Sequence, residues 1–433
     1  MKAIAVRLAV AVVTFFAGTL ANLVLRPSPA VKNVQQTITR VEPRTAPPQP
    51  SCAAALKSYL DRRDASAYER TRQADELSDR ECYGAAVALL EDAIRLDPSY
   101  SAAYGDLGYL YNSLSRFEDA ETILKKGVAL APDDTFINTE LAYALNASYK
   151  PSEAIAPLTR VGRLEPDDAY SRASLSDSYL QLGQRERAVA LAREAVKLGA
   201  ESMDEPALDN AALTLVDLGH SAEAEESVRH ALEVAPESLF AHYTLGVIQT
   251  ATGRSDAAAE SFRQVVASRA STPYEHLMRA WAQLYTGDPW GANCEARRYL
   301  ELVEWKGENV AHAGVVAYLA LRRTGRNEEA RRTLEEVAAY TNPSSFDGQM
   351  LKCLRGELPA EALLSKASNR DELSVAHSYV GLKQSLDGDS EHAASNLEWV
   401  KTKGSKLLTA YPFSLQEEAN IWEFDEHANV VPH

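Results

Sequence analysis

The stretch LDPSYSAAYGDLGYLYNSLSRFEDAETILKKGVALAP, residues 96–132, carries the pattern that decides the fold. It begins with Leu-Asp-Pro and ends with Leu-Ala-Pro, and a related Leu-Glu-Pro follows at the same interval. The three prolines, Pro98, Pro132 and Pro166, are 34 residues apart. Apolar residues between them recur at intervals of three and four, the period of amphipathic helices. A fixed period of this length indicates an array of helical repeats.

The repeat becomes clear when each unit is numbered so that its closing proline is position 32. The second unit then begins at Ser101, with large residues at positions 4, 7, 11 and 24 and small residues at positions 8, 20 and 27. This arrangement resembles the tetratricopeptide repeat, and it recurs in frame along about ten helix pairs between residues 53 and 403. The second unit shows it at Tyr104, Leu107, Gly108, Tyr111, Ala120, Leu124 and Gly127.

The resemblance implies an all-α fold, a right-handed superhelical solenoid of about ten helix-turn-helix pairs. A membrane helix or signal sequence is expected to precede it. Small residues at positions 8 and 20 would let the two helices of a unit approach closely, while each unit buries its apolar face against its neighbours. The expected boundaries are 1–25 for the membrane segment, 26–50 for a linker, 51–403 for the solenoid and 404–433 for a cap or tail.

The amino terminus has the layout of a membrane-targeting segment. Lys2 and Arg7 precede residues 8–25, which carry no charge and are long enough to span a bilayer as a helix. A signal peptide cleaved near Ala21 and an uncleaved anchor both fit; the anchor is favoured because the apolar run continues to Leu25. The proline-rich residues 26–50 would then be a semi-stiff linker.

The location expected from this layout is a single-pass membrane anchor with the body on the exported, periplasmic side. Basic residues flank residues 8–25 on both sides, so the charge bias leaves the orientation open. A soluble cytosolic protein is a weaker alternative.

The charge is unevenly distributed. The chain has a net charge of −16, of which the first 50 residues contribute about +5, so the remainder is strongly acidic. Such a body repels phosphates and anionic headgroups, which argues against nucleic acid or a lipid surface as its ligand. Solubility alone also accounts for the acidity.

The sequence lacks the common signatures of catalysis. It has no GxSxG, no HExxH, no glycine-rich phosphate loop and no set of residues with metal-ligand spacing. We therefore expect no enzyme activity, cofactor, metal or small-molecule substrate. Of the four cysteines, Cys52 and Cys82 are the one pair considered for a disulfide, but free thiols are favoured.

The candidate site follows from the resemblance. In tetratricopeptide repeats, positions 2, 5, 9, 12 and 13 of the first helix line the concave surface, and aromatic anchors with polar neighbours are typical of peptide-binding grooves. The position-2 aromatics could instead pack between units. The candidate groove residues are Tyr109, Asn112, Phe136, Thr139, Tyr143, Asn146, Tyr170, Asp177, Gln181, Phe240, Tyr243 and Val247.

One subtype of the family is not expected. Chaperone-binding members grip a peptide carboxylate with Lys and Asn at positions 5 and 9. This chain has Gly105, Tyr109, Thr139 and Tyr143 at those positions, so a chaperone-cofactor role is not predicted.

The predicted function is a membrane-tethered scaffold that binds a protein or peptide partner in its concave groove, similar in plan to bacterial envelope repeat proteins. The alternative is a structural accessory subunit of an envelope enzyme, secretion or polymer-export complex. The tail after residue 403 is expected to cap the solenoid, although it could also be an internal peptide that occupies the groove.

Overall fold

The computed structural model of the chain describes residues 51–62 and 64–428. The chain divides into two compact units, Met1–Gln49 and Pro50–His433, and the description below concerns the second. No helix in the described ranges is long and apolar enough to cross a membrane. The predicted membrane segment at residues 8–25 and the predicted linker lie outside these ranges.

Within residues 51–62 and 64–428 the chain forms 22 α-helices and no strand, as the sequence predicted. The helices are α2 (Cys52–Leu60), α3 (Ala67–Ser78), α4 (Tyr83–Leu96), α5 (Ser101–Ser113), α6 (Phe117–Leu130), α7 (Thr135–Ala147), α8 (Pro151–Leu164), α9 (Ala169–Gln181), α10 (Arg185–Ser202), α11 (Glu205–Asp217), α12 (Ser221–Val234), α13 (Leu239–Ala251), α14 (Ser255–Ala267), α15 (Pro273–Tyr285), α16 (Pro289–Leu302), α17 (Val310–Arg323), α18 (Asn327–Ala338), α19 (Phe346–Leu354), α20 (Ala360–Leu364), α21 (Arg370–Asp387), α22 (Ser390–Lys403) and α23 (Tyr411–Ala428).

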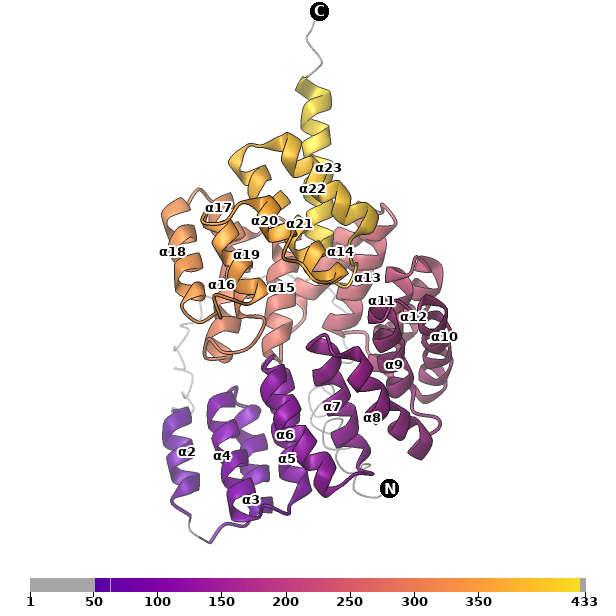
Figure 1. Cartoon of the computed structure of the whole chain (residues 1–433), viewed down its shortest axis with the longest axis vertical. Coiled ribbons are helices and arrows are strands. Elements are labelled where there is room, and N and C mark those ends of the chain that lie inside the picture. Colours follow the sequence, from indigo (N-terminus) through magenta and orange to yellow (C-terminus); the bar gives the residue numbers. More distant parts are fainter. Residues whose placement is uncertain (1–50, 63, 429–433) are drawn as a thin grey trace, which may run out of the picture. The chain divides into compact units, whose positions relative to one another are not determined.

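Twenty of these helices, α3 to α22, form ten consecutive pairs in which each helix packs on the next (Figure 1). This confirms the solenoid predicted from the 34-residue period. The pair α19 and α20 is short, with helices of 9 and 5 residues. Helix α2 precedes the first pair, and α23 follows the last.

Small residues set the distance between the two helices of a pair. A Cβ atom added to Gly108 would lie 2.3 Å from the Leu124 side chain, so the first helix approaches the second more closely than any larger residue allows. Ala120 and Ala188, both at position 20, have no exposed surface. Tyr104, at position 4, fills the space beside this contact and is also buried.

The turns between repeats are determined by local chemistry. The Asp134, Asp168 and Asp204 side chains each accept a hydrogen bond from a backbone N–H in the first turn of the following helix, which satisfies one of the donors that a helix start leaves unpaired. Within a unit, the turn often requires positive φ. Gly219, with φ +91°, meets this requirement without steric cost.

The array folds back so that its seventh and eighth pairs contact its second. Gly307, with φ +108°, lies so close to α5 that an added Cβ would be 2.7 Å from the Leu114 carbonyl oxygen. The Glu308 amide donates to the Ser115 carbonyl oxygen at 2.8 Å. The Glu308 carboxylate accepts from the amides of Phe117 at 3.0 Å and Glu118 at 3.3 Å. It therefore caps the start of α6, for which no local side chain serves as cap.

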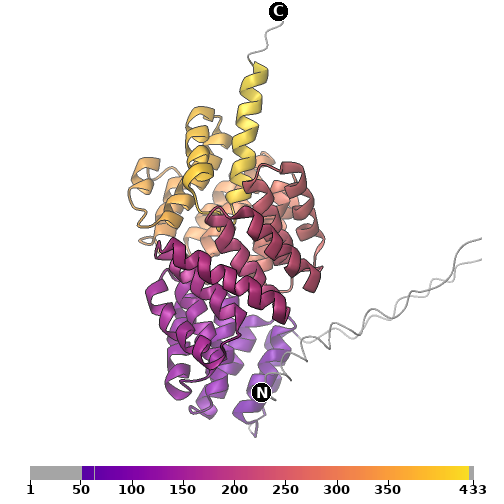
Figure 2. The same cartoon turned by 90° about the vertical axis from the view of Figure 1, so that its right-hand side faces the viewer.

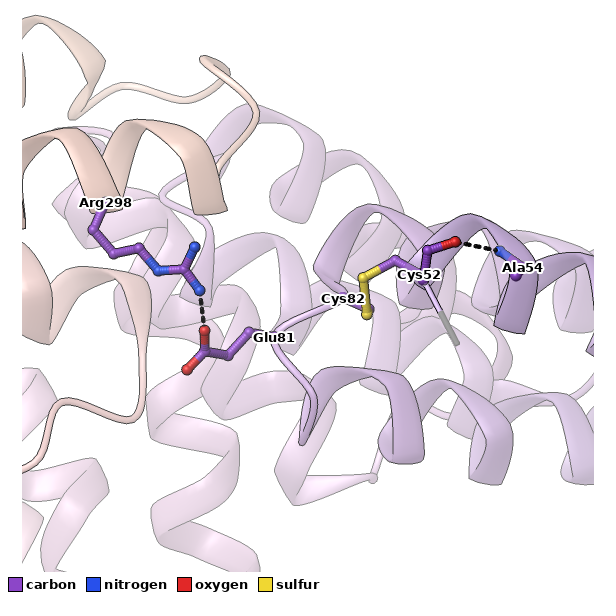
Figure 3. Close-up of a disulfide and its surroundings, with 6 residues drawn as sticks. Cys52, Ala54, Glu81, Cys82 and Arg298 are labelled. Carbon is purple, nitrogen blue, oxygen red and sulfur yellow. Dashed lines mark hydrogen bonds and ion pairs between the residues drawn. A yellow bond between two sulfur atoms is a disulfide. The ribbon is translucent and has the colours of Figure 1, made fainter. Parts of the chain in front are cut away.

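A second contact joins the first and seventh pairs. Arg298 of α16 forms an ion pair with Glu81, in the turn before α4 (Figure 3). On α4, the Tyr83 hydroxyl donates to the Ser271 carbonyl oxygen at 3.3 Å. Neighbours far apart in sequence thus hold the amino-terminal repeats against the middle of the array.

A disulfide links Cys52 of α2 to Cys82, in the turn before α4 (Figure 3). The expectation of free thiols was therefore wrong for this pair. The reason is that α2 packs on α4, which brings together two residues with no recognisable spacing in sequence. A cross-link over a 30-residue separation stabilises a fold by about 2–4 kcal/mol. Cys294 and Cys353 are free.

The close helix contact at position 20 can be tested by overpacking. Replacing Ala120 with Phe inserts a ring where no space exists, and we expect the free energy of unfolding to fall by about 1–3 kcal/mol. Lys126→Phe is the matched control, because Lys126 lies on the exposed side of the same helix. Chemical denaturation followed by circular dichroism measures both variants, and equal midpoints would contradict the assignment of position 20.

Candidate functional site

Three large aromatic rings on the concave positions of α5 and α7 remain open to solvent. Tyr109 is 51% exposed, Phe136 41% and Tyr143 42%, although large aromatic side chains are normally well buried. The Tyr109 and Phe136 ring centroids are 6.3 Å apart. The Phe117 and Tyr143 rings pack in a T-shaped arrangement with centroids 6.0 Å apart. The structure thus brings together three of the predicted groove residues.

Tyr170 and Asp177 of α9 extend this surface. Both are half-buried. Burial of the hydroxyl raises the pKa of Tyr143, and the nearby Tyr170, Tyr274, Glu140 and Asp177 raise it further. The rings and the carboxylate therefore face the same space. We call the concave side of α5, α7 and α9, lined by Tyr109, Phe136, Tyr143, Tyr170 and Asp177, the open groove.

Two carboxyl groups in the open groove, those of Glu140 and Asp177, have raised pKa values. Burial raises the pKa of Glu140 to about 7, and it raises the pKa of Asp177 to the same value. A hydrogen bond from the Asn112 amide partly offsets this at Glu140, at 2.9 Å. The Gln181 amide does the same for Asp177, also at 2.9 Å. Near neutral pH, both groups are therefore poised between the neutral and charged forms.

Glu140 is a groove residue that the sequence reasoning missed. It occupies position 6, outside the set of positions expected to line the concave surface. Its proximity to Tyr109, Tyr143 and Tyr170 is evident because it raises the pKa of all three. A carboxylate next to the lining positions on an otherwise aromatic helix face was the available signal.

Asn112 and Asn146 lie beneath this surface. Both are buried, and their amide nitrogens donate to the backbone of the next unit, to the Glu140 and Ser174 carbonyl oxygens at 3.0 Å and 3.2 Å. They occupy the same position in successive repeats. The two amides therefore join neighbouring units from below the groove.

The concave side of the later repeats is covered by the chain's own carboxyl-terminal region. Tyr243 is only 5% exposed, and its hydroxyl donates to the Thr409 carbonyl oxygen at 2.5 Å. The Gln416 amide donates to the Tyr285 carbonyl oxygen at 2.8 Å. Tyr243 is therefore covered by the carboxyl-terminal region, whereas Tyr109, Phe136 and Tyr143 are exposed.

The remaining concave positions also pack within the array. Phe240 stacks on Tyr274 of the next unit with ring centroids 6.2 Å apart, so this position-2 aromatic joins two units, the alternative that the sequence left open. Val247 is buried, while Thr139 is half-buried on α7.

The tail both caps the array and covers part of its concave side. Helix α23 packs on α21 and α22, the last pair, and also on α13 and α15. Figure 2 shows α23 rising beside the later repeats. Its residue Phe413 contacts Trp281, the position-9 residue of α15. The open groove on α5, α7 and α9 is the part of the concave surface on which no such contact is formed by residues 404–421.

Across residues 51–62 and 64–428, no three His, Cys, Asp or Glu side chains converge as metal ligands would.

Comparison with known proteins finds one family whose models match parts of this chain. Family models of the tetratricopeptide repeat match residues 80–136, 169–199 and 210–274. No curated protein sequence matches the chain.

Several solved structures of repeat proteins are similar. YrrB, described as a tetratricopeptide repeat protein with an unusual peptide-binding site, is 20% identical; the match covers 44% of this chain and 96% of that one, with a TM-score of 0.32. A thermophilic tetratricopeptide repeat protein of Thermus thermophilus is 23% identical, with coverages of 42% and 98% and a TM-score of 0.38. PilW, a type IV pilus biogenesis factor, is 21% identical, with coverages of 46% and 92% and a TM-score of 0.39.

The raised pKa of Asp177 makes stability depend on pH. The folded-state pKa of about 7 exceeds the ordinary value of 3.8, so the stability that Asp177 contributes below about pH 4 is lost as the pH rises toward 7. Asp217 and Asp371 add to the shift. We expect the melting temperature of Asp177→Asn to fall less than that of the protein with Asp177 when the pH is raised from about 5 to about 8.

The control for this measurement is Asp133→Asn, whose side chain is 76% exposed. Melting curves at the two pH values compare the three proteins. A pH dependence for Asp177→Asn as steep as that of the control would show that the Asp177 carboxyl is not held in its neutral form.

Proposed function

Because the chain is a tetratricopeptide repeat protein, and such repeats are protein-interaction scaffolds, we propose that it holds a protein partner in the open groove. The observation that carries this proposal is the exposure of Tyr109, Phe136 and Tyr143 on one concave surface. Rigid aromatic rings with polar neighbours supply most of the binding energy in many protein interfaces.

The architecture around these rings favours a preformed site. Tyr109 and Phe136 contact each other, and Tyr143 is held by Phe117. Below them, the Asn112 and Asn146 amides fix the spacing of α5, α7 and α9. A partner would therefore bind without having to order these side chains, which reduces the entropic cost of association.

The scaffold is further proposed to be tethered to a membrane through residues 8–25, with its body on the exported side. The uncharged run at the amino terminus supports the tether. The Cys52–Cys82 disulfide supports export, because disulfides persist in oxidising compartments and are rare in the cytosol.

The groove can be tested by affinity capture from detergent-solubilised membranes. Tyr109→Ala combined with Tyr143→Ala removes two aromatic anchors, each worth on the order of 1–2 kcal/mol. We expect the amount of captured partner to fall by roughly tenfold or more.

The matched control combines Tyr68→Ala with Tyr340→Ala, which removes two exposed rings that are not groove residues. Quantitative mass spectrometry compares the three baits. Identical partner lists from the groove variant and the unchanged protein would refute binding through this surface.

A further inference from the structure

The covered half of the concave surface shows which chemistry this array binds. Asp217, at position 13 of α11, has a buried side chain, and a buried carboxylate requires partners. The Arg370 guanidinium supplies them in a forked pair, at 2.5 Å and 3.2 Å from the two carboxylate oxygens. The Lys406 backbone amide donates to the same carboxylate at 2.8 Å.

The chain segment held there runs across successive repeats and is recognised mainly through its backbone. The Lys406 ammonium group donates to the Val216 carbonyl oxygen at 2.8 Å. Three residues later, the Thr409 carbonyl oxygen accepts from Tyr243 of the next first helix. Concave carboxylate and tyrosine side chains thus hold the backbone of a non-helical segment with a basic side chain.

The open groove presents the same kinds of group, tyrosine hydroxyls and carboxylates. Tyr143 and Asp177 both occupy position 9, on successive first helices, and Glu140 lies beside them. From the second to the seventh unit, none of the concave positions is Lys, Arg or His, whereas three are Asp: Asp177, Asp209 and Asp217. The groove therefore lacks cations of its own at these positions to neutralise its carboxylates.

Asp209, on the neighbouring helix α11, is a further concave carboxylate with no basic partner in the described ranges. It is 4% exposed at concave position 5 of α11, next to α9. One of its oxygens accepts from the Thr244 hydroxyl at 3.0 Å. The other oxygen is buried and has no hydrogen-bond partner among the described residues. Buried carboxylate oxygens are normally paired; at Asp209, burial raises the pKa to about 7, which favours the neutral carboxylic acid.

From these contacts we propose that the open groove takes an extended polypeptide segment of a partner protein that carries Lys or Arg side chains. This inference rests on the proposed function of the groove and adds the chemistry of the ligand. Carboxylates would pair with the basic groups, tyrosine hydroxyls would bind the peptide backbone, and the exposed rings would pack on the aliphatic stems and face the cations.

Fluorescence anisotropy with labelled peptides tests the inference on the full chain in detergent. The first probe is a decapeptide of alternating Lys and Ala, and the second alternates Glu and Ala. We expect the Lys-Ala peptide to bind and the Glu-Ala peptide not to bind. Glu140→Gln with Asp177→Asn should weaken the Lys-Ala peptide by roughly fivefold to tenfold, because two charge pairs are lost.

The control variant combines Asp133→Asn with Glu233→Gln, whose side chains are 76% and 74% exposed. It removes the same number of carboxyl groups, away from the groove, and should bind the Lys-Ala peptide unchanged. Equal weakening in the two double variants, binding of the Glu-Ala peptide, or no binding of either peptide would overturn the inference.

A third probe separates a partner from this chain's own amino-terminal region. A labelled peptide of residues 26–50 carries Arg26, Lys32, Arg40 and Arg44. If it binds the groove more tightly than the Lys-Ala peptide, the occupant is the chain itself and the partner proposal is overturned.

Capture from membranes distinguishes this inference from the proposed function. If the Tyr109→Ala, Tyr143→Ala protein loses its partner while the Glu140→Gln, Asp177→Asn protein keeps it, the groove still binds a protein and only its preference for basic segments is wrong. If neither variant loses the partner, the proposed function itself fails.

Discussion

The close approach of the two helices in each repeat is the contact on which the rest of the structure depends. Gly108 against Leu124 and the buried alanines at position 20 allow it. Once one side of each first helix is used for this contact, the opposite positions are directed to the concave side of the array. The same spacing rule therefore fixes both the packed core and the row of residues available to a partner.

Contacts between distant parts of the chain then determine how many of these concave residues remain accessible to a partner. Glu308 caps α6 from 191 residues away, and Arg298 pairs with Glu81. The carboxyl-terminal region covers α11, α13 and α15 through Asp217, Tyr243 and Trp281. The concave side of α5, α7 and α9, where aromatic rings and carboxylates are concentrated, remains accessible.

The fold could be predicted because the sequence repeats its pattern of large and small residues at a fixed interval. Pro98, Pro132 and Pro166 give the repeat length, and the small residues at positions 8 and 20 give the helix pairing. The outward direction of Tyr109 and Tyr143 followed from their position in the unit. Glu140 did not follow, because position 6 lies at the edge of the lining face and its direction depends on how neighbouring units are rotated.

Other features depend on tertiary packing that a period cannot express. Asn112 and Asn146 share position 12, and nothing in the sequence indicates that their amides donate to the backbone of the next unit, as they do in the structure. Tyr243 has the position of a groove residue but is covered by Thr409. The Cys52–Cys82 pair required knowing that α2 packs on α4. In each case the deciding neighbour is outside the repeat.

The central claim is that α5, α7 and α9 form the binding surface while the later repeats are already occupied by the chain itself. Hydrogen–deuterium exchange of the full chain, with and without its captured partner, tests this directly. The account predicts slower exchange in residues 101–113, 135–147 and 169–181, and no change in α11, α13 and α15. Slower exchange confined to the second helices of the repeats, or release of residues 404–417 on binding, would contradict it.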